Sequence, residues 1–243
     1  MRLFASELLK VWTAPRTVFG ILLAELVIVA LATVAHVHSA RNNNPLPTPF
    51  VRDLVSIIGV SVLFAVLLGV LIATTEYRHG TITQTFLAYP VREQVIGAKA
   101  LAAALVGVLL AAPAVVLSFG IALVWVGGHQ GFDLGSDELG LIGRLFLGAA
   151  VGAVLGLFIG AALARQLGAV ILVLGWLVFI EPIIGGLFPK TRDYLPGRGV
   201  IGGILGHSGE GSPSLGKALA VGLAYLVGLG SISLVITRRR DIT

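Results

Sequence analysis

Long apolar stretches constrain this chain more than any other feature of its sequence. Crossing the hydrocarbon core of a bilayer takes about 20 apolar residues in one helix. A transmembrane β-barrel would instead need short strands of alternating polarity. The sequence therefore predicts an all-α, polytopic membrane protein, a single transmembrane domain over residues 1–243. Its six expected transmembrane helices cover residues 17–37, 54–75, 95–126, 141–164, 167–188 and 215–237.

The composition supports a membrane protein and excludes a water-soluble enzyme. Only 12% of the residues are charged and 56% are hydrophobic, whereas an ordinary soluble domain is about one quarter charged. The chain has no cysteine, which excludes a disulfide framework and a thiolate nucleophile. Its net charge of +5 comes from basic residues scattered among apolar runs. We therefore expect membrane lipid, and not nucleic acid, as a partner.

Lysine and arginine residues near the ends of the spans predict the orientation. The cytoplasmic ends of transmembrane helices carry an excess of these residues. Here the segment before the first span is basic, and Arg238, Arg239 and Arg240 follow the last span. We therefore expect both termini in the cytoplasm, with residues 76–94 as the large cytoplasmic loop.

Two short patterns resemble catalytic or nucleotide-binding signatures, and neither fits its chemistry. Residues 211–217 match a phosphate-binding loop, but Ala218 stands where a serine or threonine must bind magnesium. Ser208 lies in a motif like that of intramembrane serine proteases, but its surroundings form a polar loop. The sequence therefore predicts no catalytic residue, no metal site and no cofactor bound by this chain.

Two carboxylates fall inside predicted spans. Glu25 lies in the first span, and Glu181 lies in the fifth, directly before Pro182. A carboxylate at membrane depth is costly unless it is protonated, paired or hydrated, so each is either functional or a packing contact. Arg144 lies at a depth that makes it a plausible partner of Glu181. Proline breaks helices, so we expect the fifth span to end or bend at Pro182 and the chain to hug or partly re-enter the outer face until about residue 206.

Glycines recur at every fourth position of the fourth span and so form one stripe on its helix. Small residues at this spacing let two helices approach closely in lipid. The sequence predicts tight packing here, against either another helix of this chain or a second subunit. The stripe consists of Gly148, Gly152, Gly156 and Gly160.

The loop at residues 76–94 combines a polar entry, a glycine and a short amphipathic run. Ile82, Phe86, Leu87 and Tyr89 supply its apolar side chains. This pattern predicts a short helix at the membrane surface with its threonine- and glutamine-rich face toward the cytosol. The third span is longer than the hydrocarbon core, so we expect its Lys99 end to project into water.

This stretch resembles the permease subunit of type-2 ABC exporters, which works with a separate ATPase. In that family a Glu-x-x-x-Gly-Thr element, a short coupling helix and a Pro-x-x-Arg element follow the second span. The chain supplies Glu76, Gly80, Thr81 and Pro90, while its arginine, at 92, falls one place early. A lysine follows at position 99. Residues 1–16 also resemble the family's amphipathic elbow helix, and residues 195–196 its outer re-entrant region.

The resemblance implies a half-transporter in the plasma membrane of a bacterium. Two permease subunits, identical or related, would sit on two copies of the ATPase, which would bind ATP and Mg²⁺ and drive export of an amphiphilic substrate. The residues that would couple the two subunits are Glu76, Arg78, Gly80, Thr81, Phe86 and Arg92. An alternative is a stand-alone secondary transporter or channel that uses Glu25 and Glu181 as ion sites. A membrane-embedded enzyme is a third reading, but the sequence offers no polar dyad at membrane depth.

Overall fold

The computed structural model describes residues 2–13, 15–43, 45–47, 49–132, 135–206 and 213–239, and every element among them is a helix. Three helices have π or 3₁₀ geometry and are labelled η. In chain order the elements are α1 (Arg2–Thr13), α2 (Pro15–Ala40), α3 (Phe50–Ile58), α4 (Ser61–Arg78), α5 (Ile82–Ala88), α6 (Arg92–Val126), α7 (Ser136–Leu163), α8 (Gln166–Gly175), η1 (Trp176–Ile180), α9 (Glu181–Leu187), η2 (Pro189–Tyr194), η3 (Pro196–Ile201), α10 (Gly202–Leu205) and α11 (Leu215–Arg239).

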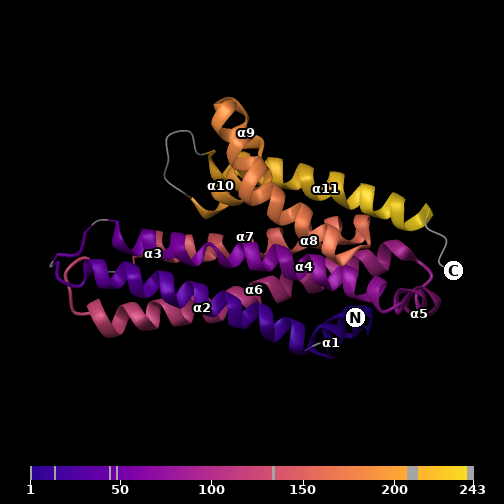
Figure 1. Cartoon of the computed structure of the whole chain (residues 1–243), viewed down its shortest axis with the longest axis horizontal. Helices are drawn as coiled ribbons and strands as arrows, with labels where there is room; N and C mark the ends of the chain where they lie inside the picture. Colours follow the sequence, from indigo (N-terminus) through magenta and orange to yellow (C-terminus); the bar gives the residue numbers. More distant parts are fainter. Residues whose placement is uncertain are drawn as a thin grey trace.

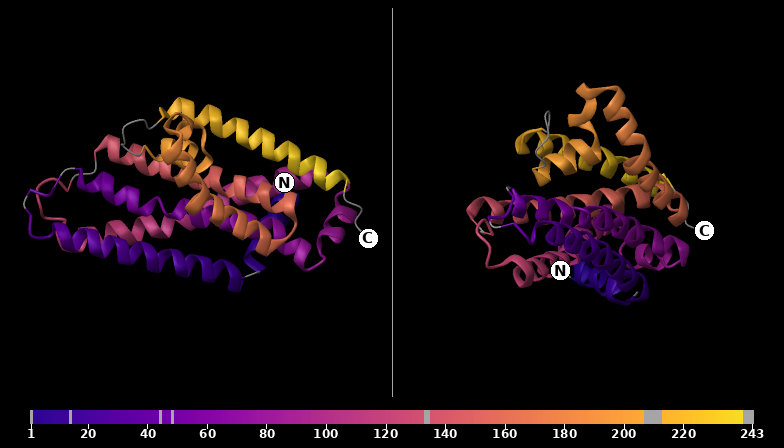
Figure 2. Two further views of the ribbon diagram at one scale, coloured as in Figure 1. Left: turned by 45° about the horizontal axis from the view of Figure 1, so that its top comes forward. Right: turned by 60° about the vertical axis from the view of Figure 1, so that its left-hand side comes forward.

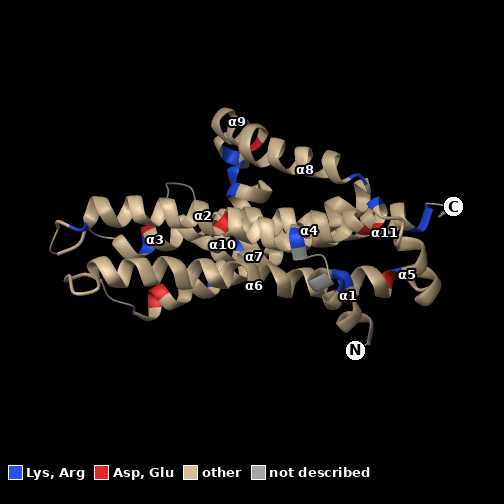
Figure 3. Ribbon diagram, turned by 60° about the horizontal axis from the view of Figure 1, so that its bottom comes forward, with Lys and Arg blue, Asp and Glu red and all other residues tan. Residues whose placement is uncertain are grey.

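Six of the described helical segments are long and apolar enough to cross a membrane, as the sequence predicts. Figure 3 shows long stretches of these helices without charged residues. The second span begins at Phe50, four residues before the predicted boundary at 54, because α3 and α4 follow one another with only a short turn between them. The spans are Arg16–Ala40, Phe50–Arg78, Arg92–Val126, Ser136–Leu163, Gln166–Leu187 and Leu215–Arg239.

The spans form two groups. The helices α2, α4, α6 and α7 make a compact bundle, and α8 to α11 lie along one side of it (Figures 1 and 2). At one end of the bundle lie α1, α5 and the final turns of α11, and at the other end lie α3 and the segments that join α2 to α3 and α6 to α7 (Figure 1).

The glycine stripe of α7 packs against α4 of the same chain, which settles the partner that the sequence leaves open. A Cβ atom added at Gly156 would lie 2.0 Å from the carbonyl oxygen of Val66, and one added at Gly69 of α4 would lie 1.9 Å from that of Ala153. The two backbones therefore touch directly, and a side chain at either glycine would force them apart. Gly152 and Gly160 extend this contact, and Gly148 lies at ordinary contact distance from Val62.

The fifth span does not end at Pro182. The chain continues from α8 through the π-helix η1 into α9, and the helix ends at Leu187. Because proline has no amide hydrogen, the carbonyl one turn earlier loses its usual donor, and a π-helical widening is a common way for a helix to accommodate such a loss. After Leu187, the segments η2, η3 and α10 fold back against α9, α7 and α11.

Candidate functional site

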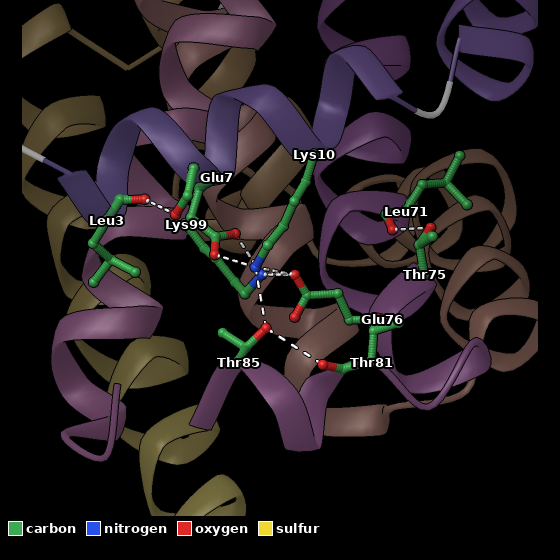
Figure 4. Close-up of polar contacts among 10 residues, drawn as sticks. Leu3, Glu7, Lys10, Leu71, Thr75, Glu76, Thr81, Thr85 and Lys99 are labelled. Atoms are coloured by element: carbon green, nitrogen blue, oxygen red, sulfur yellow. Dashed lines mark hydrogen bonds and ion pairs between the residues drawn. The ribbon is translucent and has the colours of Figure 1, made fainter. Parts of the chain in front are cut away.

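Four charged side chains form a closed ring where α1, α4 and α6 meet (Figure 4). The two oxygens of Glu7 accept from two lysines, Oε1 from Lys10 at 2.6 Å and Oε2 from Lys99 at 2.5 Å. Glu76 Oε1 accepts from the same lysines, at 2.8 Å and 2.5 Å respectively. Two carboxylates and two ammonium groups thus balance each other and join three helices.

Three members of the ring are shielded from solvent. The side chains of Glu7, Glu76 and Lys99 are 2%, 9% and 6% exposed, and that of Lys10 is 40% exposed. A buried ion pair gains little net stability, because desolvation offsets the attraction, but removing one partner leaves a charge without compensation and costs about 3–5 kcal/mol. The ring therefore fixes the relative positions of its helices more than it raises overall stability.

The ring corrects the expectation that Lys99 projects into water. The side chain lies inside the protein because the carboxylates of α1 and α4 cover it. Partial burial acts to lower the pKa of Lys10, but its hydrogen bonds to Glu7 and Glu76 outweigh this effect and raise the pKa above its ordinary value. Lys10 thus remains charged at neutral pH.

A short helix, α5, is present within the loop at residues 76–94, and the ring reaches it. Lys10 donates to the hydroxyl of Thr85 at 3.1 Å. Thr85 is therefore buried against α1, whereas Leu87 is 80% exposed. The predicted orientation is wrong for Thr85, since a charge on another helix, and not polarity alone, decides which side of α5 is covered.

The turn between α4 and α5 explains the spacing of Glu76, Gly80 and Thr81. The amide of Thr81 donates to the carbonyl of Glu76 at 3.0 Å, and that of Gly80 donates to Tyr77 at 3.4 Å. This is the Schellman arrangement that closes a helix end, and it needs a left-handed residue, which Gly80 supplies with φ of 67°. Glu76 therefore ends α4 with its backbone and joins the ring with its side chain.

The other predicted coupling residues link this end of the bundle to the side helices. Arg78 donates to Gln166 at the start of α8 at 3.2 Å. The guanidinium of Arg92 lies over the ring of Phe86, 5.2 Å from its centroid, and donates to the carbonyl of Thr237 near the end of α11. The six coupling residues thus lie at one end of the molecule, but only Glu76 belongs to the ring.

An open hollow of about 550 Å³ lies beside the ring, between α1, the end of α4 and α5. Most residues that line it have polar side chains, although the surface that they present to it is mainly apolar. Glu76 is among them, and its buried Oε2 atom has no hydrogen-bond partner among the described residues. The residues that line it are Ser6, Lys10, Thr75, Glu76, His79, Thr81, Gln84, Thr85, Ala88 and Tyr89.

Sequence reasoning missed Glu7 and Lys10 and misplaced Lys99. Glu7 and Lys10 are three residues apart and so share one face of α1, a spacing that the sequence does show. The signal that the sequence offers is Glu7 itself, the one acidic residue in the basic segment 1–16. The pairing with α6 joins residues 7 and 99, which are far apart in the chain, and so depends on the tertiary fold.

The predicted pairing of Arg144 with Glu181 is not formed. The Glu181 side chain is buried, and its carboxylate accepts from two backbone amides, that of Gly197 at 3.0 Å and that of Arg198. The guanidinium of Arg144 instead lies beside Gly206, where an added Cβ would be 3.2 Å from it. The fold-back of η3 delivers its amides to Glu181, which sequence position alone does not show.

Further polar contacts, from α11, hold this folded-back segment, which Glu181 of α9 also holds. Lys217 of α11 pairs with Asp193 at 2.6 Å and lies 4.8 Å from the centroid of the Tyr194 ring. The hydroxyl of Tyr225 donates to the carbonyl of Tyr194 at 2.9 Å. The segment is thus held by side chains from both of its neighbours.

Glu25 lies apart from Glu181 and from the ring. Its side chain is fully buried, and neither carboxylate oxygen has a hydrogen-bond partner among the described residues. The hydroxyl of Ser61 on α4 faces the carboxyl closely enough to act on it, but without the geometry of a normal hydrogen bond. By contrast, Thr33 and Ser118 pair across α2 and α6 at 2.8 Å.

Within the described ranges, no group of three or more histidine, aspartate or glutamate residues is arranged to hold a metal ion. Ser208 and Arg240 lie outside the described residues, as does the start of the phosphate-loop pattern at residues 211–217. A scan against models of known protein families and a search of curated proteins both find no match to this chain.

Proposed function

We propose that this chain is the membrane-spanning permease subunit of an ATP-driven exporter that resembles the type-2 ABC class. In this proposal both termini and α5 face the cytoplasm of a bacterium, and a separate ATPase hydrolyses ATP. The observation that carries the proposal is the attachment of α5 to α1, α4 and α6 through the buried ring, beside a hollow that a cytosolic partner could enter.

The attachment gives a physical route for transmitting motion. A force on α5 passes through Thr85 and Lys10 to the ring, and through Glu76 to α4. Because α4 touches α7 backbone to backbone, the two helices must move together. An exposed apolar residue, Leu87, and the hollow beside α5 supply a surface that a cytosolic ATPase could grip.

Site-specific crosslinking tests this proposal. The chain has no cysteine, so a substitution introduces a single thiol. Leu87→Cys places it on α5 at a position that is 80% exposed, and Val124→Cys places it at the far end of α6 at a position that is 81% exposed. In membranes of the native host labelled with a maleimide–benzophenone reagent and irradiated, we expect an ATP-hydrolysing protein to crosslink to the first variant and not to the second.

The crosslinked protein identifies the partner, and ATP should change the yield because nucleotide binding moves the ATPase. Crosslinking of an ATPase at both positions, or at neither, contradicts the proposal. Loss of the crosslink in Gly80→Pro, which disrupts the turn before α5, would further place the contact on this helix.

The second candidate, a stand-alone transporter or channel, requires ion sites at both Glu25 and Glu181. The two amides that bind Glu181 argue against its use as an exchanging site. This candidate expects transport that follows a proton gradient and continues when the ATPase is deleted, whereas the exporter expects transport to stop.

A further inference from the structure

Glu25 occupies an unusual position in the first span. It lies about 14 Å along α2 from Arg16, at the helical rise of about 1.5 Å per residue, and none of its side chain is exposed. Neither carboxylate oxygen has a hydrogen-bond partner among the described residues. An ionised carboxylate in such surroundings is strongly unfavourable, whereas a protonated one is far less so.

The hydroxyl opposite Glu25 is also unengaged. Ser61 is fully buried at the first position of α4, and its Oγ atom has no partner among the described residues. Other hydroxyls of the same span donate to the carbonyl four residues earlier: Ser56 to Arg52, and Thr74 to Val70. Ser61 does not, because a turn at Gly59 separates α3 from α4. Its hydroxyl is therefore available to the carboxyl of Glu25.

The charged groups on the elements that pack against α2 have other positions. Arg52 of α3 donates to the carbonyl of Gly206 at 2.9 Å, and Asp53 is exposed. The charged groups of the ring come from α1, α4 and α6: Glu7, Lys10, Glu76 and Lys99. The other charged residues of α6 contact α11, because Arg92 donates to the carbonyl of Thr237 and Glu93 pairs with Arg238. Among the described residues, burial and Ser61 are what act on Glu25.

We infer that Glu25 is a proton-binding site, occupied when α2 packs against α4. The proton lies between the carboxyl of Glu25 and the hydroxyl of Ser61. Its release leaves a negative charge with no basic partner, and this charge must be hydrated. Water can reach it only if α2 separates from α4, so proton release and the loosening of this helix contact are coupled.

Glu181 provides a matched control in the same chain. It is also buried, with 1% of the residue exposed, but two backbone amides donate to its carboxylate. Donors of this kind stabilise the ionised form. The two buried carboxyls should therefore differ in protonation although they are buried to the same extent.

Dicyclohexylcarbodiimide distinguishes the two states, because it adds to protonated carboxyls in apolar surroundings and gives a stable acylurea without a leaving group. The whole chain in lipid nanodiscs is treated at about pH 6, and the modified peptides are mapped by mass spectrometry. We expect an adduct on Glu25, none on that peptide in Glu25→Gln, and none on Glu181. An adduct on Glu181 but not on Glu25 overturns the inference.

The dependence of thermal stability on pH tests whether the folded chain holds a proton on Glu25, even if the carbodiimide does not reach this carboxyl. If the folded chain holds a proton that the unfolded chain releases more readily, wild-type stability falls as the pH rises. Between about pH 5 and about pH 9 we expect the Tm of the wild type to fall by about 3 °C or more relative to Glu25→Gln. Glu181→Gln should depart from the wild type less than Glu25→Gln does, because two backbone amides donate to Glu181. Parallel curves for the wild type and Glu25→Gln overturn the inference.

Discussion

The contact between α4 and α7 differs in kind from the contacts that hold α8 to α11 against the rest of the bundle. Over their most apolar stretches, the spans that contain α4 and α7 have 56% of their residues buried, against 17% for the α8–α9 span and for α11. The first contact is made by backbone atoms at glycine positions. The second combines a small apolar cluster, in which Val173 of α8 joins Val66 and Val70 of α4, with a polar contact near a helix end, that of Arg78 with Gln166.

This difference separates a rigid part of the molecule, built on α4 and α7, from a more loosely attached part, which runs from α8 to α11. The ring is built on the rigid part, so movement of α5 reaches α4 and α7 without being absorbed by side-chain rearrangement. The loosely attached helices expose large apolar side chains, including Phe179, Leu223 and Val227. In a membrane such faces contact lipid or another transmembrane helix.

The largest effect is expected where the two backbones touch. Gly156→Ala places a methyl group 2.0 Å from the carbonyl of Val66, so α4 and α7 must separate. We expect a loss of about 4 kcal/mol or more in the free energy of unfolding, seen as a lower Tm and as aggregation on size exclusion in detergent. Gly175→Ala in α8 is the control, because its added methyl meets no atom within 4 Å. Equal effects of the two substitutions would remove the distinction between the two parts.

The next largest effect is expected at the ring. Lys99→Met leaves the carboxylates of Glu7 and Glu76 with only one ammonium group, and we expect a loss of about 3 kcal/mol. In the double variant Lys99→Met, Glu76→Gln the charges balance again, so part of this loss should return. Chemical unfolding of both variants measures the difference. A double variant whose loss of stability equals the sum of the losses in the two single variants would show that the two residues act independently and that the ring is not a unit.

A smaller and more local effect is expected at Glu181. Glu181→Leu removes the acceptor for the amides of Gly197 and Arg198, at an expected cost of about 2 kcal/mol. Because η3 belongs to the loosely attached part, we expect the loss of stability to be confined to that part. Hydrogen exchange should quicken in η2 and η3 while the amides of α4 and α7 keep their protection. Faster exchange in α4 would contradict the separation of the two parts.

The sequence predicts features that depend on neighbours along the chain and misses those that depend on tertiary contact. The six spans follow from local hydropathy, and the packing at Gly156 follows from a spacing of four on one helix. The turn at Gly80 likewise follows from residues close in sequence. The polar sites depend instead on contacts between helices that are far apart in the sequence. Lys99 was expected in water because the third span is longer than the hydrocarbon core, but Glu7 covers it from another helix.

Glu181 illustrates a second limit. Its partners are backbone amides, which every residue except proline carries, so no residue type marks them in the sequence. Position in the sequence therefore favours an opposite charge at the same depth, Arg144, whose guanidinium lies beside Gly206 instead. Burial of a carboxyl was predictable from its position in an apolar run, but the group that would satisfy it was not.

The smallest effect is expected at the exposed ion pair between Glu93 and Arg238, which joins the first turn of α6 to the end of α11. Arg238→Gln removes the charge from a side chain that is 61% exposed. Exposed pairs contribute about 0–1 kcal/mol and weaken with salt, so Tm should change little and the change should vanish at high ionic strength. This substitution sharpens the comparison because α11 has further attachments, at Arg92 near this end and at Asp193 near the other. A large loss of stability here would mean that one surface contact holds α11, and the polar contacts along its length would then be incidental.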